Sequence, residues 1–75
     1  MELVKKYPIN ILKQKMLGKK VHFTSDCQLF PNFNVTGKVI EINLNGNIPL
    51  IKTILTNGKI INIDGGMSNL SFDLS

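Results

Sequence analysis

Two Asn-Gly pairs, at residues 45–46 and 57–58, divide the second half of this chain into short runs rich in isoleucine, leucine and valine. Asn-Gly between two such runs is a strong short-range signal for a β-hairpin, because both residues tolerate the positive φ of a tight turn. Four runs surround or follow these pairs, at residues 35–44, 49–56, 59–63 and 68–74. The pattern therefore predicts consecutive antiparallel strands joined by tight turns.

The N-terminal part of the chain has a different, helical pattern. Residues 9–17 carry apolar side chains at i, i+3 and i+7, namely Ile9, Leu12 and Met16. Pro8 suits the start of a helix and Gly18 suits its end. We predict a short helix between them.

A strand and a long loop are expected between this helix and the hairpins. Residues 19–25 alternate, with Val21 and Phe23 on one side, and Phe23 is expected in the core. Residues 24–34 contain Pro31 and scattered polar side chains, which predicts a loop.

The predicted fold is mainly β: a small, partly open, five-stranded antiparallel barrel of the SH3-like or Sm-like kind, with a short N-terminal helix. Ile42, Ile48 and Leu50 are expected in its core. Val39 and Ile42 cannot share a face of a regular strand, nor can Ile48 and Ile51, so a β-bulge or strong coiling is expected in both strands. A two-sheet or open arrangement is not favoured, because it would leave long edges exposed.

The length of 75 residues fits a single domain, with residues 1–18 as a basic segment and helix and residues 19–75 as the barrel. Cys27 is the single cysteine, which excludes a disulfide within the chain, and with His22 it gives too few soft ligands for a structural zinc site. No cofactor is expected. No apolar run is long enough to span a bilayer and no signal peptide is recognisable, so a cytoplasmic location is expected.

The net charge of +4 is concentrated at the N-terminus. Residues 1–20 hold six lysines and one acid, which gives +5, whereas residues 21–75 hold three lysines and four acids, which gives −1. The six lysines are Lys5, Lys6, Lys13, Lys15, Lys19 and Lys20. A basic segment of this kind indicates either a solvated helix face or a nucleic-acid partner. Because the chain has no arginine, any such contact should be weakly sequence-selective and salt-sensitive.

The spacing of one glycine and its neighbours resembles the first signature of Sm-like domains, the ring-forming RNA binders that include Sm, LSm and Hfq proteins. The matching positions are Gly37, Val39, Ile42, Asn43, Asn47, Ile48 and Leu50. The resemblance implies RNA binding, more readily than DNA binding, with Asn43 and Asn47 in a base pocket. The family has an aspartate where this chain has Asn43, and a basic residue where it has Asp64.

A second resemblance is to the C-terminal SH3-like barrel of RimP-type ribosome-maturation factors. It rests on the segment GKKVHF at 18–23, on Gly37 nineteen residues after Gly18, and on the strand pair that ends in NGKIINI at 57–63. This pattern accommodates the long loop at 24–34 and implies a ribosome-related RNA setting.

The sequence predicts a non-enzymatic binding module. His22 and Cys27 could form a nucleophile pair, but no third residue that would orient them is recognisable. The first hypothesis is nucleic-acid binding through the N-terminal lysines. The alternative is a protein-interaction module that docks on a host protein through Leu29, Phe30 and Phe33. The abundance of isoleucine, lysine and asparagine beside no alanine or arginine fits an AT-rich source, such as a phage, a mobile element or a low-GC bacterium. A free barrel edge could also pair with a second copy of the chain.

Overall fold

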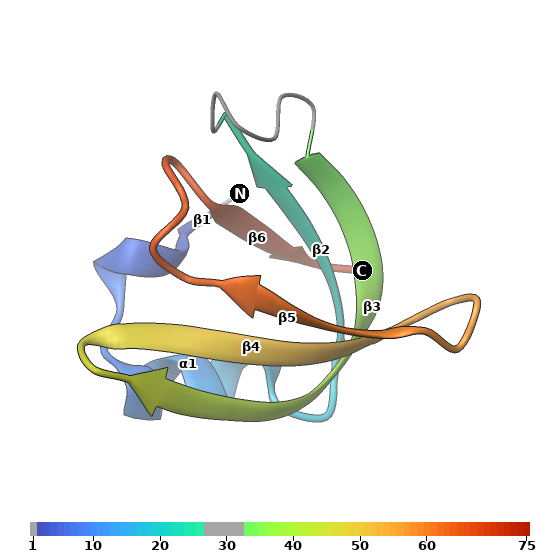
Figure 1. Cartoon of the computed structure of the whole chain (residues 1–75), viewed down its shortest axis with the longest axis horizontal. Helices are drawn as coiled ribbons and strands as arrows, with labels where there is room; N and C mark the ends of the chain where they lie inside the picture. Colours follow the sequence, from blue (N-terminus) through green and yellow to red (C-terminus); the bar gives the residue numbers. More distant parts are fainter. Residues whose placement is uncertain (1, 27–32) are drawn as a thin grey trace.

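The computed structural model describes residues 2–26 and 33–75 (Figure 1). The predicted helix is confirmed as α1, Ile9–Met16. Leu12 and Met16 are fully buried and Ile9 packs against the core beside them. The helix ends where the Leu17 N–H bonds to the Lys13 carbonyl, and Gly18 follows with a φ of 78°. Glycine adopts this positive φ at little cost, which explains why the helix ends here.

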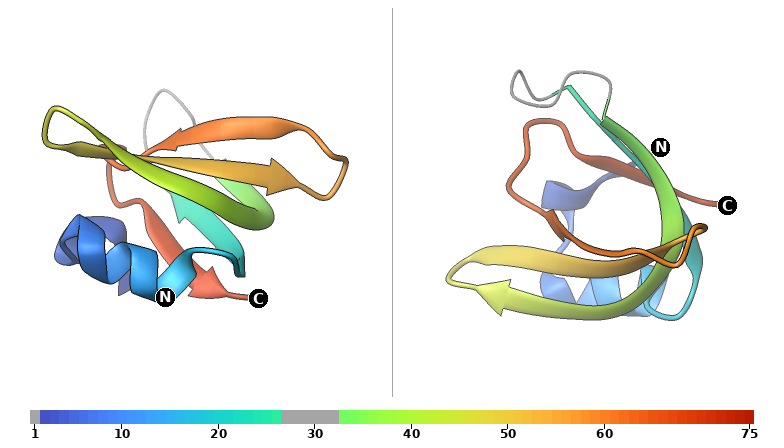
Figure 2. Two further views of the ribbon diagram at one scale, coloured as in Figure 1. Left: turned by 90° about the horizontal axis from the view of Figure 1, so that it is seen from below. Right: turned by 45° about the vertical axis from the view of Figure 1, so that its right-hand side comes forward.

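A single antiparallel sheet forms most of the molecule. Its strand order is β1-β6-β2-β3-β4-β5. The strands are β1 Glu2–Leu3, β2 Lys20–Ser25, β3 Phe33–Asn45, β4 Ile48–Leu55, β5 Ile60–Asp64 and β6 Ser71–Leu74. The expectation of five strands is therefore wrong by one. In the part of the chain that the structure describes, β1 and β5 are edges that do not pair with each other, so the sheet is curved but unclosed (Figures 1 and 2).

The extra strand, β1, is only two residues long, and its side chains are exposed, so no periodic pattern announces it. It pairs with β6 through Glu2–Phe72 and Leu3–Ser71. The 3-10 helix η1, Val4–Lys6, follows at once and buries Val4 completely. The Val4 N–H donates to the Leu70 carbonyl at 2.9 Å. The N-terminus is thereby attached to the end of the sheet where β6 begins.

Both tight turns are confirmed. β3 and β4 are joined at Gly46, with a φ of 65°, and β4 and β5 at Gly58, with a φ of 85°. β2 and β3 extend into the loop predicted at residues 24–34, since Thr24 pairs with Asn34 and Ser25 with Phe33. The loop is therefore shorter than predicted. Leu29 and Phe30 lie outside the described residues.

The expected bulge is present in β3 and absent from β4. The register shifts between Val39 and Glu41, and this extra residue allows both Val39 and Ile42 to be buried. β4 keeps a regular register, so Ile51 is buried while Ile48 is 41% exposed. The expectation that Ile48 lies in the core is wrong, because it flanks the turn where the hairpin leaves the core.

The core lies inside the curve of the sheet, with α1 beneath the β3–β4 part (Figure 2). Phe23 is fully buried there, as expected. The buried apolar residues are Val4, Leu12, Met16, Val21, Phe23, Val39, Ile42, Ile51, Ile63, Leu70 and Phe72. None of the helices in the described part of the chain has the length and hydropathy needed to span a bilayer.

Candidate nucleic-acid interface

A hollow of about 280 Å³ opens where the β3–β4 turn faces η1 and the segment after β5. We call it the Asn47 hollow. Its lining residues are Val4, Lys5, Tyr7, Asn47, Ile48, Pro49, Gly65 and Gly66. The hollow thus contains both Lys5, from the basic N-terminal segment, and Asn47. Lys5 was predicted as a nucleic-acid contact from its charge, and Asn47 from the Sm-like resemblance.

The turn after β5 forms one wall of the Asn47 hollow. The Gly65 N–H donates to the Pro49 carbonyl at 2.8 Å, and the Asp64 carboxylate accepts the Gly66 N–H at 2.7 Å. A Cβ on Gly65 would lie 2.5 Å from Pro49 Cγ, so only glycine fits this close approach. Asp64, which stands where Sm-like domains have a basic residue, therefore stabilises a turn. Lys5 is the cation among the residues that line the hollow.

Tyr7 is held in the wall of the hollow by three partners. Its hydroxyl donates a hydrogen bond to the Glu2 carboxylate. The Lys15 Nζ lies 4.8 Å from the Tyr7 ring centroid and 3.8 Å from the Glu2 carboxylate. The Tyr7 ring meets Phe72 edge-on, with centroids 6.1 Å apart. The hydrogen bond from Tyr7, helped by the positive charge of Lys15, lowers the pKa of Glu2, and the same bond raises the pKa of Tyr7.

The six predicted lysines do not form one continuous track. Lys5 lines the Asn47 hollow, while Lys15 and Lys19 line a second, mixed hollow that also contains Glu2 and Asp73. Lys6 and Lys13 are exposed, on η1 and α1 respectively. Within residues 2–26 and 33–75, the structure has one ion pair with a distance below 4.0 Å, between Lys15 and Glu2. The other described lysines are therefore available to an anion.

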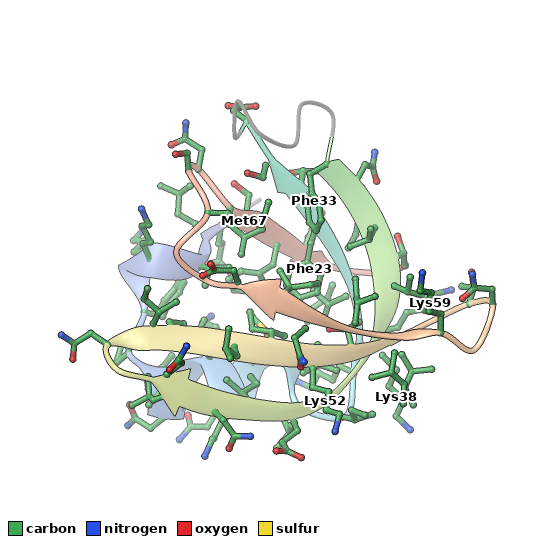
Figure 3. All side chains as sticks on the ribbon, viewed as in Figure 1. Phe23, Phe33, Lys38, Lys52, Lys59 and Met67 are labelled. Atoms are coloured by element: carbon green, nitrogen blue, oxygen red, sulfur yellow. The ribbon has the colours of Figure 1, made fainter. Side chains whose placement is uncertain are left out.

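The sheet register brings Lys20 together with Lys38, a lysine outside the basic N-terminal segment. Lys20 of β2 lies opposite Lys38 of β3, and the same row continues to Ile54 and Ile60. Lys20 and Lys38 line a shared groove of about 490 Å³. Figure 3 shows Lys38 on the β3–β4–β5 side of the molecule, together with Lys52 and Lys59. Like charges directly opposite each other destabilise a sheet, so this pair is a second candidate for anion binding. A prediction of the register of β2 against β3 would have been needed to find this lysine pair from the sequence.

Asn43 is separate from Asn47. It lies on β3 opposite Leu50, and its amide donates to the Glu41 carboxylate. It is not among the residues that line the Asn47 hollow. Of the two asparagines that the Sm-like resemblance points to, the structure therefore places one in a hollow.

Phe33, the described member of the predicted docking loop, is half-buried at the start of β3. It packs against the core and lines an apolar hollow of about 370 Å³ with Ile61, Asn62, Ile63, Asp64 and Met67. We call this the Phe33 hollow. Figure 3 shows Phe33 and Met67 on the same side of β5, above Phe23. Part of the Phe33 ring thus packs against the core, and part remains accessible from the hollow.

His22 faces the outer side of β2, where its Nε2 is hydrogen-bonded to Asn34 Oδ1. Cys27 lies outside the described residues. Among those that are described, no group of three or more His, Cys, Asp or Glu side chains is arranged to hold a metal ion.

Comparisons of the chain with protein-family models, with curated proteins and with solved structures return no match.

Proposed function

We propose that this protein is a non-enzymatic nucleic-acid-binding module, and that it binds single-stranded RNA in preference to DNA. We further propose that the curved sheet is a variant of the small SH3-like or Sm-like barrels, in which β6, β2, β3, β4 and β5 surround the core. The order of those five strands and the position of α1 support this second proposal.

One observation carries the functional proposal: Lys5, Tyr7 and Asn47 line one hollow. The Asn47 amide offers a donor and an acceptor for a base edge. Pro49 and the Tyr7 ring offer apolar surface against a base, and Lys5 offers a cation for the adjoining phosphate.

The test is the binding of a fluorescently labelled, mixed-sequence single-stranded RNA, measured by anisotropy at several salt concentrations. Affinity should fall steeply between about 50 and 200 mM salt, because lysine–phosphate contacts release counterions. Lys5→Gln should reduce the slope of log affinity against log salt by about 1. Asn47→Ala should weaken binding at every salt concentration.

Lys52→Gln is the matched control, because Lys52 lies on β4 opposite Glu41, away from the Asn47 hollow. It should change binding less than Lys5→Gln does. Absence of binding near 50 mM salt would refute the nucleic-acid proposal. Tighter binding of the matching DNA would refute the preference for RNA.

A protein-interaction module is the second candidate function, in which the chain docks on a host protein through Leu29, Phe30 and Phe33. The accessible part of Phe33 in the apolar Phe33 hollow favours it. The test compares Phe30→Ser and Phe33→Ser for folding by circular dichroism and for capture of a partner. A folded Phe30→Ser variant that retains every captured protein would contradict this candidate.

A further inference from the structure

Lys20 and Lys38 are held side by side by the hydrogen-bond pattern of the sheet. The Val39 N–H donates to the Lys19 carbonyl at 3.0 Å, so residues 19 and 39 form a hydrogen-bonded pair. Because pairs alternate along an antiparallel ladder, the next pair, Lys20 and Lys38, is a non-hydrogen-bonded one, in which Cα atoms are about 4.5 Å apart and side chains lie close together. Val21 and Val39 beside them are buried, so both lysines project from the outer face of the sheet.

Among the described residues, no acid lines the groove that contains this pair. The lining residues are Gly18, Lys20, Gly37, Lys38, Ile54, Leu55 and Thr56. The acids of the neighbouring strands lie opposite other residues. Glu41 of β3 lies opposite Lys52, and Asp73 of β6 lies opposite His22. Like charges directly opposite each other destabilise a sheet. The fold therefore contains a repulsion at this pair that a bound anion would relieve.

The helix α1 connects the Asn47 hollow to this groove (Figure 2). It begins two residues after Tyr7, which lines the hollow, and ends two residues before Gly18, which lines the groove. Successive residues of a helix are about 100° apart, so Lys13 and Lys15 project from nearly opposite flanks. Lys15 is engaged with Glu2, whereas Lys13 is exposed on the other flank. An exposed cation thus lies on the element that joins the two places.

We propose that one single-stranded RNA segment occupies both places, with a base in the Asn47 hollow and its backbone phosphates beside Lys13 and the Lys20–Lys38 pair. The inference rests on the proposed function and extends it from one hollow to a path across the molecule. Within the described part of the chain, the groove has no aromatic ring on which a base could stack. Its two lysines therefore suit the backbone of a single strand and not a base.

The separation of the two places determines the length of RNA that the path requires. Residues 7–18 span roughly 16 Å along the axis of α1, at about 1.5 Å per residue. Along β3, residues 38–45 span roughly 23 Å. Stacked nucleotides advance about 3.4 Å each, so the path requires roughly five to seven nucleotides. A shorter RNA would reach the hollow or the groove but not both.

The test is the anisotropy assay with RNAs of about four to ten nucleotides. Wild-type affinity should rise by about tenfold or more as the RNA is lengthened from about four to about seven nucleotides. The double variant Lys20→Gln/Lys38→Gln should lose most of this gain, and its slope of log affinity against log salt should be lower by about 2. Lys13→Gln should lower the slope by about 1. Lys52→Gln, which removes one charge opposite Glu41, is the control and should change the slope less.

A stability measurement separates binding lysines from structural ones. Lys38→Gln should weaken RNA binding and yet melt at the same temperature as wild type or higher, because it removes the repulsion from Lys20. A lower melting temperature would overturn the inference, since the pair would then stabilise the sheet. RNA binding whose salt slope and length dependence are unchanged in the double variant would overturn the inference alone and leave the proposed function standing. Absence of binding of every RNA near 50 mM salt would refute both.

Discussion

Among single residues, Tyr7 connects three parts of the molecule that are distant in sequence. Through Glu2 it contacts β1, through Lys15 it contacts α1, and through Phe72 it contacts β6. Exposed ion pairs contribute little one at a time, but a shared network costs less entropy for each contact. Tyr7 therefore stabilises the attachment of the N-terminus and also shapes the Asn47 hollow.

This cluster predicts a pH dependence of stability. The folded state lowers the pKa of Glu2 below its ordinary value of 4.5, so the ionised carboxylate stabilises the fold above that value. The contribution is lost as the pH falls through the lowered pKa. The melting temperature of wild type should therefore fall more steeply on acidification than that of Glu2→Gln. Parallel melting curves for the two proteins would contradict the role of this carboxylate.

Tyr7 gives a pH dependence of stability of the opposite sign, at alkaline pH. Its pKa is raised above its ordinary value of 10.0, so the neutral phenol stabilises the fold below that value and the effect is lost as the pH rises through the raised pKa. Tyr7→Phe should remove the alkaline dependence and reduce the acid dependence, because Lys15 still lowers the pKa of Glu2. Glu2→Gln keeps the phenol but removes the carboxylate that raises its pKa, so it should reduce the alkaline dependence as well.

Gly37 predicts a large effect from a single methyl group. A Cβ at this position would lie 2.4 Å from the Ile54 carbonyl oxygen and 2.7 Å from Thr53 Cγ2. Because the first of these atoms is backbone, β3 and β4 must separate, and Gly37→Ala should lose about 1–3 kcal/mol of unfolding free energy in urea. Gly46→Asn is the control: it lies in open space, and asparagine tolerates its φ of 65°. A loss in Gly37→Ala no larger than in Gly46→Asn would show that the strands yield easily.

At the scale of elements, α1 is held by packing, because a helix of eight residues is marginal in isolation. Leu12 is fully buried and Leu17, just past the helix, is 41% exposed. Leu12→Ala should cost about 2–5 kcal/mol of unfolding free energy in urea. The matched change Leu17→Ala should cost less than about 1 kcal/mol. Similar losses from the two variants would mean that α1 does not pack on the sheet as described.

The sequence predicts those elements whose signals are local. The Asn-Gly turns and the i, i+3, i+7 spacing of α1 depend on neighbouring residues, and both are confirmed. The β3 bulge could be inferred because Val39 and Ile42 had to share a face. β1 could not, since two exposed residues have no periodicity and are ordered by β6. Ile48 was misplaced because its exposure depends on where the hairpin leaves the core.

At the scale of the whole molecule, the candidate site was predictable only in part. Lys5 and Asn47 were both identified from the sequence, but their shared hollow depends on η1 lying beside the β3–β4 turn, which no local pattern encodes. The pairing of Lys20 with Lys38 likewise depends on the register of β2 against β3. The long-range register of the strands therefore determines which charged side chains lie close together, even where each element is correctly predicted.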